Sequence, residues 1–271
     1  MKRMLQTWLV LLALGAALLG QAKEPTLDEA LAGYYKARGG LEKLQGLKGW
    51  KLTGTIVLTA QELAMPLSMW QKFPDKLRVE TTFEGRTTVQ AFDGRTAWWI
   101  VPLISAQARE MPPDQGLPFR RQAGFEDPLV VWKEKGYRLE LLGRETAEGV
   151  PALKLKLTTA DGSVILFFID DAGLLRKSAM PLATGENPPL LEVIYGDYRP
   201  VDGLQMPFAI ENRDNGRTQM TIAAESIEIA PDLPDSLFAM PGGPAKGGDR
   251  KVGGQKPAAK PGKAKERKAK K

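Results

Sequence analysis

The sequence predicts a mainly β protein of the α+β class, in which an antiparallel sheet curls around a helical segment. A short helical pattern near the N-terminus is followed by runs in which apolar and polar residues alternate. Turn motifs containing glycine separate these runs, and one proline-rich stretch interrupts them. Alternating runs joined by such turns are typical of antiparallel sheets with one apolar and one solvated face. We therefore expect a strongly curved sheet of roughly ten strands with the first helical segment on its concave side.

Residues 1–22 have the three-part layout of a secretory signal peptide. Two basic residues precede an apolar stretch from Leu9 to Leu19, and Gly20 and Ala22 then place small residues where a signal peptidase cleaves. The stretch is shorter than the about 20 residues that cross a bilayer, so a retained anchor is the less favoured alternative. We expect cleavage after Ala22 and a periplasmic protein. Because the chain has no cysteine, it cannot be acylated as a lipoprotein.

The helical segment extends from Thr26 to Leu47. Thr26 and Glu29 are spaced as a capping box, in which a hydroxyl and a carboxylate satisfy free amides at the start of a helix. Apolar residues follow at helical spacing, and Gly39-Gly40 is expected to end the first helix. The next seven residues favour a short second helix.

The strands follow from Trp50 onward, where the hydrophobic period becomes two. The clearest runs are 50–59, 76–83 and 153–158, in which large apolar residues alternate with Lys, Arg, Glu or Thr. The turns are predicted from residues that tolerate tight backbone conformations. They are Phe83-Glu84-Gly85-Arg86, Asp93-Gly94, Asp161-Gly162, Asp171-Ala172-Gly173, Asp202-Gly203 and Asn215-Gly216.

The alternation stops between Met111 and Lys135, where four prolines divide the chain. Asp127-Pro128 is a good start for a short helix, because proline suits the first helical position. We expect a mobile helical cover over the open side of the curled sheet, and an ordinary core helix remains the alternative. The candidate cover residues are Phe119, Phe125, Leu129 and Trp132.

The composition excludes several kinds of chemistry. With neither Cys nor His, the chain has no thiolate nucleophile, imidazole base or Cys/His zinc site. The best group of carboxylates is Asp170, Asp171, Glu186 and Asp197, but Asp170-Asp171-Ala172-Gly173 fits a hairpin turn better than an acid–base pair. We expect no catalysis, no metal and no cofactor.

Charge is distributed unevenly along the chain. The net charge is +6, yet the tail from Gly242 to Lys271 has eleven basic and two acidic residues, which leaves −5 on residues 23–241. A tail of Lys, Ala, Pro and Gly cannot bury enough apolar surface to order itself, so we expect residues 242–271 to be disordered. Such a tail is either a solubilising extension or a tether to anionic lipid. Export argues against a nucleic-acid partner.

Four motifs, taken in order, resemble the LolA-type periplasmic lipoprotein carriers. Trp70–Pro74 is similar to the W-x-K-x-P strand end of that family, and Phe92–Trp99, followed by Pro102, is similar to its D-G-x-x-x-W hairpin. Tyr195–Pro207 resembles a pattern of the broader outer-membrane lipoprotein-sorting group, and Asp235–Pro241 resembles the end of its domain. The likeness covers roughly Thr26 to Pro241, and we expect residues 23–241 to form a single LolA-like domain.

The resemblance implies an incomplete antiparallel barrel with helices plugging its concave side and a cavity that shelters acyl chains. A carrier of this kind needs a dry apolar face, because an acyl chain in water loses about 0.8 kcal/mol per methylene. Methionine suits such a face because its side chain adapts to flexible ligands. The candidate lining is the apolar side of the strands: Trp50, Leu52, Ile56, Leu58, Met65, Met69, Leu77, Val79, Phe83, Trp98 and Ile100.

The chain departs from the family at Phe73, where the carriers have an arginine that latches the lid. The mechanism that opens the lid must therefore differ. The implied partners are a lipoprotein or another envelope lipid as cargo, with an inner-membrane donor and an outer-membrane acceptor. The alternative is a periplasmic sensor or regulatory domain on the same fold, which would bind lipid or protein signals.

Overall fold

A computed structural model describes residues 24–124, 126–181, 189–229 and 233–242. The predicted signal peptide, Phe125, Glu186 and the tail beyond Gly242 lie outside the described residues. The chain divides into two compact units, Met1–Met240 and Pro241–Lys271.

The N-terminal helix begins at the capping box that the sequence predicts. Helix α1 spans Leu27–Arg38, and the Thr26 hydroxyl accepts from the amide of Glu29 while the Glu29 carboxylate accepts from the amide of Thr26. Gly39 ends the helix in the left-handed region with φ of 112°, which glycine adopts without a steric penalty. The short helix α2, Leu41–Gly46, follows.

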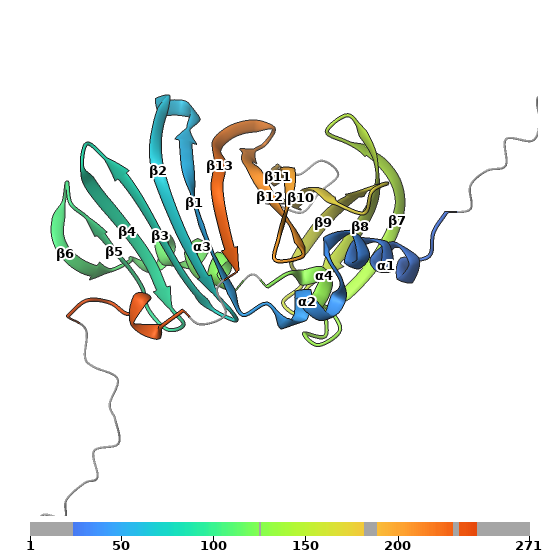
Figure 1. Ribbon diagram of the computed structural model, residues 1–271, viewed down its shortest axis with the longest axis horizontal. Helices are drawn as coiled ribbons and strands as arrows, with labels where there is room; N and C mark the ends of the chain where they lie inside the picture. Colours follow the sequence, from blue (N-terminus) through green and yellow to red (C-terminus); the bar gives the residue numbers. More distant parts are fainter. Residues whose placement is uncertain (1–23, 125, 182–188, 230–232, 243–271) are drawn as a thin grey trace, which may run out of the picture. The chain divides into compact units, whose positions relative to one another are not determined.

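A single antiparallel sheet of 13 strands follows the helices, in the order β6-β5-β4-β3-β2-β1-β13-β12-β11-β10-β9-β8-β7. Among the described residues no ladder joins β6 to β7, so the sheet is curved and open (Figure 1). The mainly β, half-barrel class is confirmed. The strands are β1 (Gly49–Leu58), β2 (Leu63–Lys72), β3 (Lys76–Phe83), β4 (Arg86–Asp93), β5 (Ala97–Val101), β6 (Ser105–Glu110), β7 (Arg138–Ala147), β8 (Val150–Thr158), β9 (Val164–Asp170), β10 (Leu175–Pro181), β11 (Leu190–Val201), β12 (Leu204–Asp214) and β13 (Arg217–Ile229).

The expected number of about ten strands is too low. Some strands lack the alternating pattern, because side chains on both of their faces are covered. In β9, the four consecutive residues Phe167–Asp170 are all buried. Its neighbour β10 also has two consecutive buried residues, Ser178 and Ala179. A two-residue period does not detect such strands.

The tight turns form where glycine and its neighbours predict them. In four hairpins both central residues have positive φ, as the two-residue turns that match strand twist require. Three of these pairs, Glu84-Gly85, Asp202-Gly203 and Asn215-Gly216, lie in predicted turns, and the fourth, Glu148-Gly149, was not predicted.

The proline-rich interruption forms two helices, α3 (Pro113–Ala123) and α4 (Pro128–Val131). Asp127 is the N-cap of α4, and its carboxylate accepts from the amide of Leu129 at 3.1 Å, with Pro128 at the first helical position. The prediction of a helical insertion in the middle of the sheet is confirmed.

The helices divide the concave side into two apolar cores (Figure 1). The α1 core packs α1 and Leu129 of α4 on β7–β10; its buried residues are Ala30, Leu31, Tyr34, Leu129, Leu139, Leu153, Leu155, Leu157, Ile165, Phe167, Ile169 and Leu175. The α3 core packs α2, α3 and Met111 on β1–β5, β12 and β13. Its buried residues are Leu44, Leu52, Ile56, Met65, Leu67, Met69, Leu77, Phe92, Ala97, Met111, Ala123, Leu204, Met206, Phe208, Ala224 and Ile227.

Candidate functional site

The pairing register determines which predicted residues share the concave face. Leu52 of β1 lies opposite Met69 of β2, which in turn lies opposite Val79 of β3. Neighbours at such positions point to the same side of a sheet. The same registers place the other predicted residues of β1–β3 on this face, which are Trp50, Ile56, Leu58, Met65, Leu77 and Phe83.

Trp98 and Ile100 lie on the opposite face of the sheet, so the expectation that they share the concave side is wrong. Ala97 pairs with Phe92 of the α3 core, and successive residues in a strand alternate between faces. Trp98 is fully buried in a small outer cluster with Val89 and Ala91, and Ile100 packs against the same cluster. Of the neighbours Trp98 and Trp99 in β5, it is Trp99 that faces the concave side.

The motif residues of the outer face hold the end of the domain. The indole of Trp98 donates to the carbonyl of Phe238 at 2.8 Å, and Arg78 donates to the carbonyl of Leu237 at 2.9 Å. Lys72 donates to the carbonyl of Leu233 at 2.5 Å. The Trp and Lys positions that carry the sequence resemblance therefore fasten the segment around the turn Asp235–Leu237 to the sheet.

Most of the predicted lining is buried against the helices. Leu52, Ile56, Met65, Met69 and Leu77 have relative exposures between 0% and 8% and belong to the α3 core. Trp50, Leu58 and Val79 are half-buried against the same core. Phe83 lies at a hairpin turn with 42% of its surface exposed.

Helix α3 is tied to this face by a buried side chain that the sequence analysis missed. The Gln71 amide, 3% exposed, donates to the carbonyl of Ala123 at 2.6 Å, at the C-terminal end of the helix. An unpaired carbonyl at a buried helix end is costly, so this bond satisfies a group that α3 leaves free. A signal was available, because Gln71 is two residues from Met69 in a strand and must share its face.

Helix α4 is tied to α1 by a polar network. The Tyr34 hydroxyl donates to Asp127 Oδ2 at 2.5 Å, and Arg38 Nη1 donates to the Tyr34 hydroxyl at 2.8 Å and lies 3.7 Å from Asp127 Oδ2. Arg38 Nε also donates to the carbonyl of Gln205 at 2.9 Å. Burial and the nearby Asp127 carboxylate raise the pKa of Tyr34 well above its ordinary value, so this hydroxyl stays neutral and remains a donor.

The predicted cover residues are divided between the two cores. Leu129 is fully buried in the α1 core, and Trp132 is half-buried against that core. Phe119 of α3 is half-buried against the α3 core. The segment from Met111 to Lys135 thus packs in two separate places rather than as one cap.

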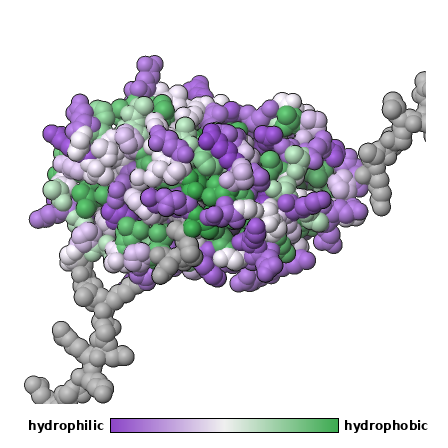
Figure 2. Space-filling model, in the orientation of Figure 1, coloured by the Kyte–Doolittle hydropathy of each residue, from purple (hydrophilic) through white to green (hydrophobic). Residues whose placement is uncertain are grey.

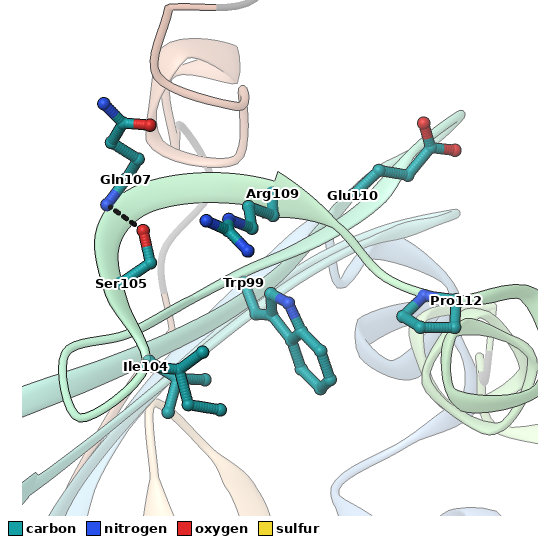
Figure 3. Close-up of a pocket in the computed structure, with 8 residues that line it drawn as sticks. Trp99, Ile104, Ser105, Gln107, Arg109, Glu110 and Pro112 are labelled. Carbon is teal, nitrogen blue, oxygen red and sulfur yellow. Dashed lines mark hydrogen bonds between the residues drawn. The ribbon is translucent and has the colours of Figure 1, made fainter.

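Figure 3 shows a pocket of about 220 Å³ at the edge of the sheet, on the concave side of β5 and β6. The Trp99 ring lies between Ile104 and Pro112, with Arg109 beside it (Figure 3). Its volume is below the roughly 300–1,000 Å³ of pockets that enclose small ligands. A second hollow, of about 450 Å³, lies between α1 and the β9–β10 turn and includes charged residues such as Lys36 and Arg144. Neither pocket offers a large, dry chamber.

Two of the carboxylates considered for catalysis have structural partners. Asp170 accepts from Arg176 at 2.6 Å and from the amide of Leu174 at 2.9 Å, which closes the β9–β10 turn as the sequence predicts. Asp197 accepts from Arg199 on the exposed side of β11. Within the described ranges, no cluster of three carboxylates suits a metal ion, and no helix is long and apolar enough to span a bilayer.

The comparisons support a LolA-like fold. No family model matches the chain, and no curated protein matches it. Among solved structures, a LolA superfamily protein from Nitrosomonas europaea is 18% identical, with a TM-score of 0.54 over 79% of this chain and 98% of that one. A domain assigned to outer membrane lipoprotein sorting, from Vibrio parahaemolyticus, is 16% identical, with a TM-score of 0.52 over 77% of this chain and 94% of that one. A DUF1329 family protein from Desulfovibrio piger is 11% identical, with a TM-score of 0.54 over 77% and 96%.

The fold defines a class of protein: the chain is an open, curved half-barrel of the LolA type with helices against its concave side. At these identities the similarity concerns the fold alone.

Proposed function

We propose that the protein is a periplasmic carrier that binds acyl chains of a lipoprotein or another envelope lipid against the concave face of β1–β3. The observation that carries the proposal is the row of apolar side chains that share this face and belong to the core that α2 and α3 cover. Four methionines, Met65, Met69, Met111 and Met206, are buried in this core. Their flexible side chains suit a surface that must repack around a chain of variable shape.

Binding requires α3 to move. The pocket beside this core holds about 220 Å³, and the predicted lining residues are in contact with one another and with the helices. A lipid chain gains about 0.8 kcal/mol per buried methylene, so a long chain compensates for separating α3 from the sheet. The Gln71–Ala123 bond is the polar contact that breaks when α3 leaves, and it takes the place of the arginine that Phe73 replaces.

The cargo is received from an inner-membrane donor and delivered to an outer-membrane acceptor. The basic tail, residues 242–271, acts as a tether to anionic lipid at either surface. The signal peptide, removed after Ala22, directs the protein to the periplasm. The carrier needs no catalytic group, because transfer consists of binding and release.

Binding of a fluorescent fatty-acyl probe tests the proposal. Met69→Glu places a carboxylate on the proposed surface, where an acyl chain in contact with it would leave the charge unpaired, so probe binding should be lost. Thr55→Glu adds the same charge to the other face of β1 and should bind the probe normally. Thermal melts followed by circular dichroism show whether each variant folds.

The outcomes separate two roles for Met69. If Met69→Glu folds and does not bind the probe, the concave face is the binding surface. If it unfolds, Met69 is essential to a tightly packed core, and the milder Met69→Ser should then weaken binding while keeping the fold. Wild-type protein that ignores acyl probes of every length contradicts the carrier function.

A further inference from the structure

The turn between β5 and β6 exposes two adjacent aliphatic side chains. Leu103 is 70% exposed and Ile104 is 74% exposed, the two highest values among the exposed large apolar residues that the structure describes. The amide of Ile104 donates to the carbonyl of Val101 at 2.8 Å, which makes the turn tight and presents both side chains at its apex. Single exposed apolar residues are common, but a bulky pair at the tip of a hairpin is a binding feature.

Behind this aliphatic apex, the hairpin carries an aromatic and a basic side chain. Val101 lies opposite Ser105 at the base of the turn, and Trp99 lies opposite Arg109 two residues further along β5. At about 3.3 Å per residue, Trp99 and Arg109 are roughly 7 Å behind the Val101–Ser105 pair. Figure 3 shows Ile104 at the turn and Arg109 beside the Trp99 ring.

This order matches the layers of a bilayer surface. Aliphatic side chains belong among the acyl chains, whereas tryptophan and arginine suit the headgroup layer because each has an apolar body and a polar end. An apolar element that lies at a membrane surface is buried about 5–10 Å deep, and the Trp99–Arg109 pair lies roughly 7 Å behind the base of the turn.

The neighbouring hairpin tip lies at the same end of the sheet. The β3–β4 turn and the β5–β6 turn share one edge because they are alternate connections of a meander (Figure 1). Phe83, at the β3–β4 turn, is 42% exposed. Glu84 and Arg86 in that turn have opposite charges, so the turn carries no net charge.

We propose that the β5–β6 apex inserts Leu103 and Ile104 into a lipid bilayer, with Trp99 and Arg109 at the headgroups and Phe83 as a neighbouring contact. The occupant is a lipid surface, because the order of apolar tip, aromatic ring and guanidinium along the hairpin follows the depth profile of a bilayer and not the flat outline of a protein partner. The inference gives the proposed carrier its docking edge: it would bring the open end of the α3 core to the membrane. Insertion itself does not depend on cargo binding.

The absence of cysteine allows a direct test in the full chain. Ile104→Cys carries a single environment-sensitive fluorophore, and Leu142→Cys, on β7 and 52% exposed, is the matched control. With phosphatidylcholine vesicles, emission from position 104 should shift to the blue while emission from position 142 should not. Measurement at about 1 M salt, where charges are screened within about 3 Å, suppresses any contribution from the basic tail.

Vesicle flotation gives a second readout. Leu103→Ser/Ile104→Ser should bind phosphatidylcholine vesicles at least about tenfold more weakly than wild type. Each substitution removes an aliphatic side chain that would be buried in the bilayer. Leu142→Ser should bind as wild type does. Both variants should melt at the wild-type temperature, because the replaced side chains are exposed.

Three results would overturn the insertion. They are an unshifted label at position 104, wild-type flotation of the double variant, and binding that appears only with anionic vesicles and vanishes in salt. The acyl-probe assay keeps the two proposals apart. Protein that inserts its tip but binds no probe refutes the carrier, and protein that binds the probe but ignores vesicles refutes the docking edge.

Discussion

The α1 core and the α3 core lie on the same sheet, yet they differ in how they are packed. In the α1 core, Tyr34, Leu129, Leu155, Leu157, Phe167 and Ile169 are at most 1% exposed. Helix α1 approaches the sheet closely: a Cβ on Gly173 in the β9–β10 turn would lie 2.7 Å from the carbonyl oxygen of Gly33. Tyr34, Arg38 and Asp127 then join α1 to α4 by hydrogen bonds. The α1 core is therefore close-packed, and a hydrogen-bond network of Tyr34, Arg38 and Asp127 holds its two helices together.

The α3 core is looser and richer in adaptable side chains. Many of its buried residues retain up to 8% exposure, and several more, such as Trp50, Leu58 and Met220, are half-buried at its margin. It contains buried methionines, whereas none of the buried residues of the α1 core is a methionine. From this difference we predict that α3 opens more readily than α1 and α4. Figure 2 shows apolar residues exposed in the middle of one face among hydrophilic ones.

The largest effect is expected from cavities made in each core. Leu155→Ala should lower the free energy of unfolding by roughly 3–5 kcal/mol, because its fully buried site cannot collapse around the void. Met65→Ala should cost about 2 kcal/mol or less, since flexible neighbours fill part of the space. Urea unfolding of the two variants measures the difference. Equal costs would mean that the cores are packed equally tightly.

Removing Asp127 from its network with Tyr34 and Arg38 should have the next largest effect on the free energy of unfolding. Asp127→Ala leaves the Arg38 guanidinium, 12% exposed, without its carboxylate and removes the cap of α4. A loss of roughly 2–4 kcal/mol is expected from urea unfolding. Asp171→Ala, which breaks an exposed contact with Arg144, is the control and should cost about 1 kcal/mol or less. A small effect at Asp127 would show that α4 is not held by α1.

Alkaline pH should destabilise the α1 half selectively. Burial raises the pKa of Tyr34, Tyr195 and Tyr198, so the folded state favours their neutral forms. The resulting stability is fully present below the unfolded pKa of about 10 and is lost as the pH rises from there through the raised folded pKa. Each such tyrosine contributes about 1.4 kcal/mol per pH unit in that window.

Urea unfolding between pH 9 and pH 11 measures this dependence. Tyr198→Phe should reduce the slope, although it also loses the hydrogen bond to the Leu175 carbonyl at every pH. A slope identical to that of wild type would mean that Tyr198 ionises in the folded protein as it does in water.

The smallest effect on global stability is expected at Gln71. Gln71→Met keeps the volume of the side chain but leaves the Ala123 carbonyl without its donor, at a cost of about 1 kcal/mol. Amide hydrogen exchange should accelerate in residues 113–123 while α4 keeps its protection, because opening of α3 is a local event. Acyl probe should then bind faster. Equal acceleration in both helices would mean that the whole cover moves as one body.

Features that depend on a few neighbouring residues were predicted correctly from the sequence. The capping box of α1, the turns at Asp202-Gly203 and Asn215-Gly216, and the cap at Asp127 are confirmed because each is set by a few neighbouring residues. The number of strands and the face of Trp98 depend instead on what covers each side of the sheet. Gln71 was missed because its partner, Ala123, lies 52 residues further along the chain.

By itself, the sequence determined the local elements of this protein. Periodicity, caps and turn residues act over a few residues, so they specify the helices, most hairpins and the antiparallel class of the sheet. Only the tertiary structure decided which face of β5 turns inward, which side chains hold α3 and α4 in place, and where the apolar apex of β5–β6 is exposed. These properties depend on register and on contacts between distant segments, and neither is encoded in the pattern of a single strand.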